Sequence, residues 1–279
     1  MPGKGHMTNN WKRTNRELWD YWTDLHQQPD SDYAELINLV SSGRSTLSPE
    51  VIQEVGDVCG KRLLHLMCHI GLDTLSWARS GALVTGLDFS ARAIAYAKSL
   101  SWEMGIPANF CCAEINQAAS VLKEKFDIIF TSDGVLPWLS DLNQWADVIE
   151  RLLNTGGIFY LSDMHPIRHL LLPRRVDDAG RPIAFGYFAQ NEPIEARERG
   201  SYALWGRGEV RTAYYWAHSL GEVVTSLCKA GLVIEFLHET AKTAPVSQVY
   251  VQVAEDQWDI ELVKELLIPN SFSIRARKL

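Results

Sequence analysis

The sequence predicts an α/β fold: a doubly wound, mostly parallel seven-stranded sheet, with an antiparallel last strand and a small cap insertion. Two observations lead to this prediction. From Lys61 onward, short apolar runs bounded by turns alternate with helical stretches, which is the pattern of parallel strands joined by crossover helices. After His165 this alternation stops and then returns near the carboxyl terminus, which indicates an insertion into the sheet.

Residues 1–60 are expected to form an N-terminal helical segment of short helices, separated at prolines and glycines. Trp11, Leu18 and Trp22 recur at a helical spacing and therefore share one face of the first helix. Packing against the core is one interpretation of this aromatic face. Closing over a ligand cleft, together with Trp19, is the other.

Seven apolar runs are expected to be the strands of the sheet, because each is bounded by turn residues and rich in branched or aromatic side chains. Their ranges are 62–67, 83–88, 109–115, 126–132, 157–163, 232–239 and 271–277. Parallel strands in one sheet need crossover connections, and the helical stretches between the first five runs supply them.

Polar residues at the starts of the crossover helices predict where those helices begin. Asp73 or Thr74 can cap the helix after the first strand, Ser90 the next one, and Asp141 the helix before the fifth strand. Gly156 is expected to end that last helix, because glycine adopts the left-handed conformation common at helix ends.

Three regions are expected after the helical segment. Residues 61–164 form the ligand-binding core, residues 165–218 the cap insertion, and residues 219–279 the carboxyl-terminal part of the sheet. Within the insertion, 183–190 and 210–218 are rich in aromatic and β-branched residues, and glycines lie between them. This composition predicts a small antiparallel ribbon rather than another crossover.

Composition and charge narrow the class of protein. The chain of 279 residues is 46% hydrophobic and 22% charged, and it has no apolar run of the roughly 20 residues that a membrane-spanning helix needs. Its amino terminus lacks the apolar segment of a secretory signal. Five cysteines without framework spacing indicate free thiols, and a net charge of −7 disfavours a nucleic-acid surface. We expect a cytoplasmic monomer or homodimer with no nucleic-acid or membrane partner.

The stretch HLMCHIG follows the first strand, where the first helix of an open α/β sheet presents free N–H groups to a ligand. Gly71 allows the backbone to turn sharply and to approach that ligand. At the end of the second strand, the Asp88 carboxylate can accept hydrogen bonds from both hydroxyls of a ribose. This pair predicts a ligand that contains adenosine. His65, Cys68 and His69 do not obviously converge, so no metal is expected.

Polar residues also end the third and fourth strands. Glu114 can accept from an adenine amino group, and Thr131, Ser132 and Asp133 face the same cleft. With these residues, the sequence resembles the class I S-adenosylmethionine-dependent methyltransferases over roughly residues 60–163. Their first motif aligns with HLMCHIG and their acidic second motif with GLDFS.

The chain resembles most a subgroup of small-molecule methyltransferases whose first motif contains Cys-His and Gly-x-Asp-Thr, as CHIGLDT does. It departs from the usual first motif at three places. His65 stands where the family has an aspartate, and Met67 and His69 stand where it has glycines. The resemblance implies a Rossmann-like methyltransferase fold.

The resemblance implies S-adenosylmethionine as the methyl donor and S-adenosylhomocysteine as the product. The residues expected to bind this cofactor are Met67, Gly71, Asp73, Thr74, Asp88, Phe89, Ser90, Ala113, Glu114, Ile115, Thr131, Asp133 and Trp11. Nucleic-acid amino-methyltransferases carry an Asn/Asp-Pro-Pro-aromatic motif after the fourth strand, where this chain has TSDGVLPW. The expected acceptor is therefore a small metabolite.

Two other functions remain open. A nicotinamide-dependent Rossmann oxidoreductase would share the sheet, although it prefers a Gly-x-Gly-x-x-Gly turn that is absent from this sequence. A catalytically silent, methyltransferase-like interaction protein would explain the altered first motif. We expect S-adenosylhomocysteine or NAD to discriminate between these functions by the thermal stability that each confers.

Candidates for catalysis and acceptor binding lie beyond the fifth strand. His165 and His218 are candidate general bases, because each is expected near a strand end. Arg174 and Arg175 can bind a carboxylate or phosphate of the acceptor.

Aromatic residues of the cap insertion are expected to select the acceptor. The insertion leaves the sheet at the carboxyl end of the fifth strand and therefore emerges beside the cofactor cleft. Tyr187, Tyr215 and Trp216 are predicted to give the acceptor pocket a largely apolar wall. Packing of the same rings between the ribbon and the sheet is the alternative.

Overall fold

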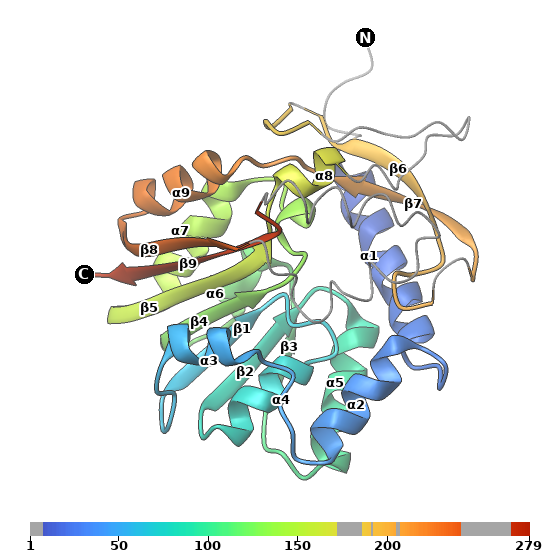
Figure 1. Ribbon diagram of the computed structural model, residues 1–279, viewed down its shortest axis with the longest axis horizontal. Helices are drawn as coiled ribbons and strands as arrows, with labels where there is room; N and C mark the ends of the chain where they lie inside the picture. Colours follow the sequence, from blue (N-terminus) through green and yellow to red (C-terminus); the bar gives the residue numbers. More distant parts are fainter. Residues whose placement is uncertain (1–7, 172–185, 191, 205–206, 241–268) are drawn as a thin grey trace.

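The computed structural model describes residues 8–171, 186–190, 192–204, 207–240 and 269–279. Seven strands form one sheet: β1 (Arg62–Leu66), β2 (Leu83–Asp88), β3 (Asn109–Cys112), β4 (Phe126–Ser132), β5 (Leu153–Met164), β8 (Leu232–Thr240) and β9 (Ser271–Lys278). Their order in space is β3-β2-β1-β4-β5-β9-β8 (Figure 1). Only β9 runs antiparallel to its neighbours β5 and β8. The predicted fold class, a mostly parallel seven-stranded sheet, is confirmed.

Helices connect the strands and precede them. They are α1 (Thr8–His26), α2 (Asp32–Ser41), α3 (Pro49–Val55), α4 (Leu72–Arg79), α5 (Ala91–Glu103), α6 (Ala118–Val121), α7 (Leu142–Leu152), α8 (Ile167–Leu171) and α9 (Leu220–Lys229). Two short 3₁₀ turns, η1 (Ile115–Gln117) and η2 (Leu136–Trp138), follow β3 and β4. No helix in the described ranges is long and apolar enough to cross a membrane.

Alternating side chains of the central strands enter two different cores, because successive residues of a strand point to opposite faces. In β1, Leu64 packs into the core that contains residues of α7 and α9, whereas Leu63 packs into the core that contains Trp77 of α4. In β4, Ile129 and Ile128 divide in the same way. The sheet is therefore covered on both faces. A ligand can reach it at the ends of its strands.

Two of the predicted helix starts are confirmed and one is wrong. The side chains of Ser90 and Asp141 accept backbone N–H groups at the first turns of α5 and α7. The residue before α4 is instead Gly71, in the left-handed conformation with φ 77° and without a side-chain cap. Asp73 and Thr74 already lie in the first turn of α4, and their side chains bond to other loops.

The predicted end of α7 is also wrong. The helix ends at Leu152, and β5 begins at Leu153, well before Gly156. Leu153 is fully buried and pairs with Phe126 of β4, so tertiary pairing overrides the local glycine signal. A shift of register between β4 and β5 accommodates the chain around Gly156.

The cap insertion contains the predicted antiparallel ribbon, but its first strand differs. The ribbon consists of β6 (Ile194–Arg199) and β7 (Val210–Tyr215), so the prediction of a strand within 183–190 is wrong for the described residues 186–190. Charged residues alternate along β6 with Ala196, which is buried against the ribbon's core. Because the buried residue Ala196 has a short side chain, the alternation of apolar and charged residues is hard to recognise in the sequence.

Helix α1 lies between the ribbon and α5 (Figure 1). Its apolar face, which includes Leu18 and Trp22, packs on the ribbon residues Ala213 and Tyr215. On its polar side, Asp20 accepts a hydrogen bond of 2.6 Å from Ser90 Oγ at the start of α5. Ion pairs Arg16–Glu114 and Asp24–Arg92 join α1 to η1 and α5. The first helix thus closes one side of the strand ends.

Candidate functional site

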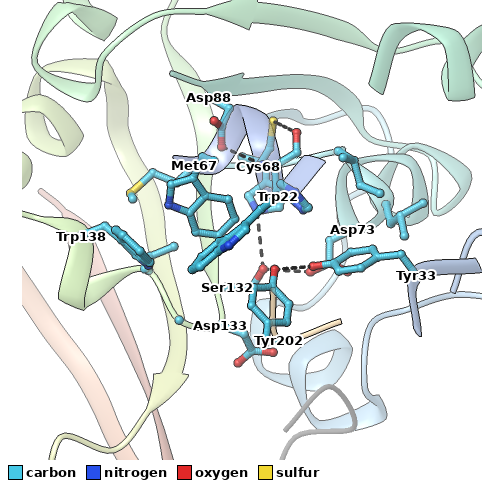
Figure 2. A pocket seen from close by; sticks show the side chains of 18 of the residues that line it. Trp22, Tyr33, Met67, Cys68, Asp73, Asp88, Ser132, Asp133, Trp138 and Tyr202 are labelled. Atoms are coloured by element: carbon cyan, nitrogen blue, oxygen red, sulfur yellow. Dashed lines mark hydrogen bonds between the residues drawn. The ribbon is translucent and has the colours of Figure 1, made fainter. Parts of the chain in front are cut away.

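A cavity of about 180 Å³ lies at the carboxyl ends of β1, β2 and β4. Residues of the loops that follow these three strands line it, together with residues of α1 and α2 and with Tyr202 (Figure 2). This is the position at which open α/β sheets bind ligands. A second, smaller cavity shares Pro137, Met164 and His169 with it.

The turn after β1 has the positive φ angles of a glycine-rich loop, although it contains only one of the expected glycines. Met67 and His69, at the two positions where the resembled family has glycine, have positive φ values of 58° and 50°. Gly71 follows with φ 77°. Left-handed backbone is unfavourable for residues with a Cβ and is found mostly where the surrounding structure requires it, often at functional sites. Met67, His69 and Gly71 all line the cavity.

Asp88 ends β2 and is buried, with 6% of its surface exposed. Its two carboxylate oxygens accept the backbone N–H groups of His69 and Ser90, each at 2.9 Å. Each oxygen has further lone pairs, so the carboxylate can still accept from a ligand. Burial raises the pKa of Asp88 to about 6, against the effect of the backbone hydrogen bonds, and Asp20 of α1 adds to the rise.

Asp73 forms the centre of a polar network beside the turn. Its carboxylate accepts hydrogen bonds from Thr46 Oγ1 at 2.5 Å and from Ser132 Oγ at 2.8 Å. His65, which replaces the aspartate of the family's first motif, bonds to Thr74 Oγ1 through Nδ1 at 2.9 Å. Burial lowers the pKa of His65 to about 4, so this imidazole is neutral at pH 7. The acidic group on this side of the cavity is therefore Asp73.

Asp133 follows β4 and lines the cavity with a side chain that is accessible from it. Its φ is 31°, an unusual value that aspartate tolerates better than most residues do. The surrounding protein raises the pKa of Asp133, and the carboxylates of Asp163 and Asp73 raise it further, while Arg168 lowers it. The loop after β4 thus presents a carboxylate with an increased affinity for a proton.

Two neutral histidines, His26 and His69, connect α1 to the turn after β1. His26 Nδ1 lies 3.1 Å from His69 Nε2, and His26 Nε2 lies 2.7 Å from Ser201 Oγ. Burial lowers the pKa of His69 to about 3, and burial together with His69 lowers that of His26. The pair joins α1 and the loop after β6 to the first-motif turn.

Five aromatic residues that line the cavity form what we call the aromatic wall: Trp19, Trp22, Tyr33, Trp138 and Tyr202. Figure 2 labels all of them except Trp19. Trp19, Trp22 and Trp138 meet edge to face with centroids 5.0–5.7 Å apart. The hydroxyls of Tyr33 and Tyr202 are hydrogen-bonded at 2.8 Å. The wall is assembled from α1, α2, η2 and the loop after β6, so it depends on how these elements dock.

The structure brings together six of the residues expected to bind the cofactor. Those that line the cavity are Met67, Gly71, Asp73, Asp88, Phe89 and Asp133. Thr74 and Ser90 lie immediately behind it and are fully buried. Trp11 instead packs against Trp216, with their ring centroids 4.5 Å apart.

The remaining predicted cofactor residues do not line the cavity. Ala113 and Ile115 pack against the core on the α7 side of the sheet, and Thr131 is fully buried. The Glu114 carboxylate pairs with Arg16 and takes part in capping η1. An adenine amino group would therefore compete with Arg16 for Glu114.

The predicted catalytic histidines also lie outside the main cavity. His165 Nε2 is 2.9 Å from Glu239 Oε1, and its Nδ1 accepts the Ile167 N–H. His218 lines the smaller cavity, and its Nε2 lies 2.6 Å from the carbonyl oxygen of Leu139. Both side chains already have structural partners.

The residues predicted to bind the acceptor are dispersed. Tyr215 is fully buried and bonds to Glu198, and its ring contacts that of Trp138 in the aromatic wall. Trp216 lines the smaller cavity, while Tyr187 contacts Phe188 and lines neither of the two cavities. Arg174 and Arg175 lie outside the described residues.

Sequence reasoning placed Trp19 near the cleft but missed most of the aromatic wall. Trp22 shares a helical face with Leu18 and Trp11, which favours a core position over a ligand contact. Tyr33 and Tyr202 are 169 residues apart, and no local pattern links them. Trp138 lies five residues after Asp133 in the loop that follows the fourth strand. Its closeness in sequence to a residue predicted at the cleft was the one indication that it would line the cavity.

Comparisons with known proteins show which kind of domain carries this cavity. Residues 58–185 match a family model described as a methyltransferase domain. A ubiquinone biosynthesis O-methyltransferase of Photorhabdus laumondii is 28% identical over 115 residues, which cover 41% of this chain and 48% of that protein. The chain thus spans about half the length of the curated relatives it matches.

Solved structures extend the similarity to most of the chain. An S-adenosylmethionine-dependent methyltransferase of Mesorhizobium loti is 20% identical, with a TM-score of 0.55 over 85% of this chain and 99% of that one. The geranyl diphosphate C-methyltransferase of Streptomyces coelicolor is 12% identical, with a TM-score of 0.56 over 91% and 86%. Residues 58–185 thus match a methyltransferase domain, and the chain shares the fold of these S-adenosylmethionine-dependent methyltransferases.

Proposed function

We propose that the protein is an S-adenosylmethionine-dependent methyltransferase that acts on a small-molecule acceptor. The observation that carries the proposal is Asp88, a buried carboxylate at the end of β2 that lines the strand-end cavity of a methyltransferase-family domain. Relatives named as O-methyltransferases of ubiquinone biosynthesis, and a C-methyltransferase of geranyl diphosphate, support an acceptor of small size.

The residues that line the cavity fit the parts of the donor. Asp88 would accept the ribose hydroxyls, and the apolar surfaces of Met67 and Phe89 would contact the adenosine. Asp73 would accept from the amino group of the methionine end and so supply the carboxylate that His65 lacks. The donor provides a methyl group activated by its sulfonium. The protein's task is then to orient an acceptor and exclude water.

Donor binding should depend on pH through Asp88. Its pKa of about 6 in the free protein means that the carboxylate is ionised at pH 7.5 and mostly protonated at pH 5. Ribose hydroxyls donate to the ionised form, so affinity for S-adenosylhomocysteine should fall about tenfold from pH 7.5 to pH 5. Calorimetry at both pH values measures this change. An Asp88→Asn variant should bind weakly with little pH dependence, and an equally steep loss in that variant would exclude Asp88 as the source.

The choice among donor classes is tested by thermal stability. S-adenosylhomocysteine at 100 times its dissociation constant should stabilise the protein by about 2.7 kcal/mol, whereas NAD should leave its melting temperature unchanged. Stabilisation by NAD alone would favour the oxidoreductase alternative. Donor binding without transfer of a labelled methyl group to any metabolite would favour the silent interaction protein.

We further propose a division of roles within the chain. Residues 61–164 hold the donor, while the helical segment 1–60 and the cap insertion 165–218 close the cavity and select the acceptor. The aromatic wall supports this division, because α1, α2 and the loop after β6 contribute four of its five rings. The five cysteines are all free, which supports the cytoplasm as the compartment.

A further inference from the structure

Three aspartates line the cavity in the part of the chain that the structure describes. Asp73, Asp88 and Asp133 line it, and no lysine or arginine does. Of the three histidines that line it, His65 and His69 are neutral at pH 7 because burial lowers their pKa values, and His169 is the third. Such a surface attracts cations and disfavours an anionic acceptor.

The aromatic wall adds a second feature that favours a cation. Four of its rings are half-buried, and all five border the same cavity as the carboxylates. Faces of tryptophan and tyrosine rings attract ammonium groups within about 6 Å of their centroids, most strongly where water is excluded. Acidic groups that line the same cavity as aromatic rings favour an amine over a neutral or acidic molecule.

Asp133 is the carboxylate best placed for such an acceptor. Asp88 is bonded to the backbone of the first-motif turn, and Asp73 accepts from two hydroxyls. No side chain of the described residues hydrogen-bonds to the Asp133 carboxylate, and its own N–H donates to Ser162 O at 2.9 Å. The loop from Asp133 leads within five residues to Trp138, so one segment carries both a carboxylate and part of the aromatic wall.

We propose that the acceptor is a small primary or secondary amine, bound as its ammonium ion between the aromatic wall and Asp133, and that Asp133 accepts its proton. This inference rests on the proposed methyltransferase function. It differs from the sequence-based expectation of a carboxylate or phosphate acceptor at Arg174 and Arg175, which lie outside the described residues. It also assigns Asp133 to the acceptor, whereas the sequence predicts that this residue binds the cofactor.

The chemistry balances without another reactant. One proton passes from the ammonium nitrogen to the Asp133 carboxylate, which frees the nitrogen lone pair. That pair forms the bond to the donor's methyl carbon as the carbon–sulfur bond breaks, and the electrons of the broken bond remain on sulfur. The products are the N-methylated ammonium ion, S-adenosylhomocysteine and protonated Asp133. The groups that surround Asp133, namely Asp73, Asp163 and Arg168, leave a net negative charge that favours proton uptake.

The test compares three probes of one shape on protein saturated with S-adenosylhomocysteine: 2-phenylethylamine, 2-phenylethanol and 3-phenylpropionate. Calorimetry should show that the amine binds at least tenfold more tightly than the alcohol or the carboxylate. In Asp133→Asn this preference should shrink to threefold or less, while affinity for S-adenosylhomocysteine stays within twofold of the parent. Asparagine is chosen because it tolerates the left-handed backbone of Asp133.

Asp147→Asn on the exposed side of α7 is the matched control and should keep the full preference for the amine. Equal or tighter binding of the alcohol or the carboxylate overturns the proposal, as does failure of the amine to bind. An unchanged preference in Asp133→Asn overturns the role of Asp133, and an equal loss of S-adenosylhomocysteine affinity assigns that residue to the donor site. If S-adenosylhomocysteine itself does not bind to the parent protein, the proposed function fails first.

Discussion

Replacing Asp163 by alanine is expected to destabilise the protein by about 3–5 kcal/mol, because a single buried carboxylate holds the loop after β4. Asp163 is 1% exposed. Its Oδ1 accepts the Gly134 N–H at 2.6 Å, and its Oδ2 accepts those of Val135 and Leu136 at 3.1 and 3.0 Å. Removing the carboxylate leaves these donors without their partner. Urea denaturation measures the loss.

Asp163→Asn is the graded control, since its amide oxygen keeps one acceptor while its amino group opposes the remaining N–H donors. We expect it to lie between the parent and Asp163→Ala in stability. The same variants should loosen the segment that carries Asp133 and Trp138, both of which line the cavity. A free energy of unfolding within 1 kcal/mol of the parent for Asp163→Ala would contradict this role.

Gly71→Ala should destabilise the protein by about 2–4 kcal/mol for two separable reasons. Its φ of 77° is unfavourable for alanine, and a Cβ at this position would lie 2.6 Å from Phe110 Cε1 and 3.2 Å from Ala97 Cβ. The sequence predicts a close approach to the ligand as the reason for this glycine. The structure adds a steric reason, because the core fills the space behind it.

Gly60→Ala separates the two contributions. Gly60 has a similar φ of 70°, but a Cβ there would meet no atom within 4 Å. Its loss of stability therefore measures the backbone cost alone, about 1–2 kcal/mol. Gly71→Ala should exceed it, and Phe110→Leu in the Gly71→Ala background should recover part of the difference. Equal losses at the two glycines would show that the contact with Phe110 costs nothing.

The parts of the fold that could be predicted are those set by local pattern. The ranges of β2 and β4 agree with the apolar runs, and Ser90 and Asp141 cap the helices as their chemistry requires. The position of Asp88 at the cavity could be predicted for the same reason, since ligands bind at the carboxyl ends of parallel strands. The predictions for the end of α7 and for the first ribbon strand were wrong. Pairing of β5 with β4 determines where α7 ends, and packing of the ribbon on α1 determines which residues form its first strand.

The aromatic wall could not be predicted, because no local pattern contains it. Tyr202 reaches the cavity only through the docking of the ribbon loop on α1, where Trp22 Nε1 donates to Gly200 O at 2.5 Å. The left-handed backbone at Met67 and His69 could not be predicted from residue preferences either, because methionine and histidine both disfavour that conformation. It became meaningful only because these two positions align with the glycines of a known motif.

The central claim is that Asp88 holds the ribose of S-adenosylmethionine in this cavity, and the most direct measurement is calorimetry of S-adenosylhomocysteine with Asp88→Ala. Loss of hydrogen bonds to a charged group should weaken binding by about 1.5–3 kcal/mol, or roughly 10–150-fold. Asp147→Ala, the same change at an exposed position of α7, should bind as the parent does. Unchanged affinity in a folded Asp88→Ala protein would contradict the claim.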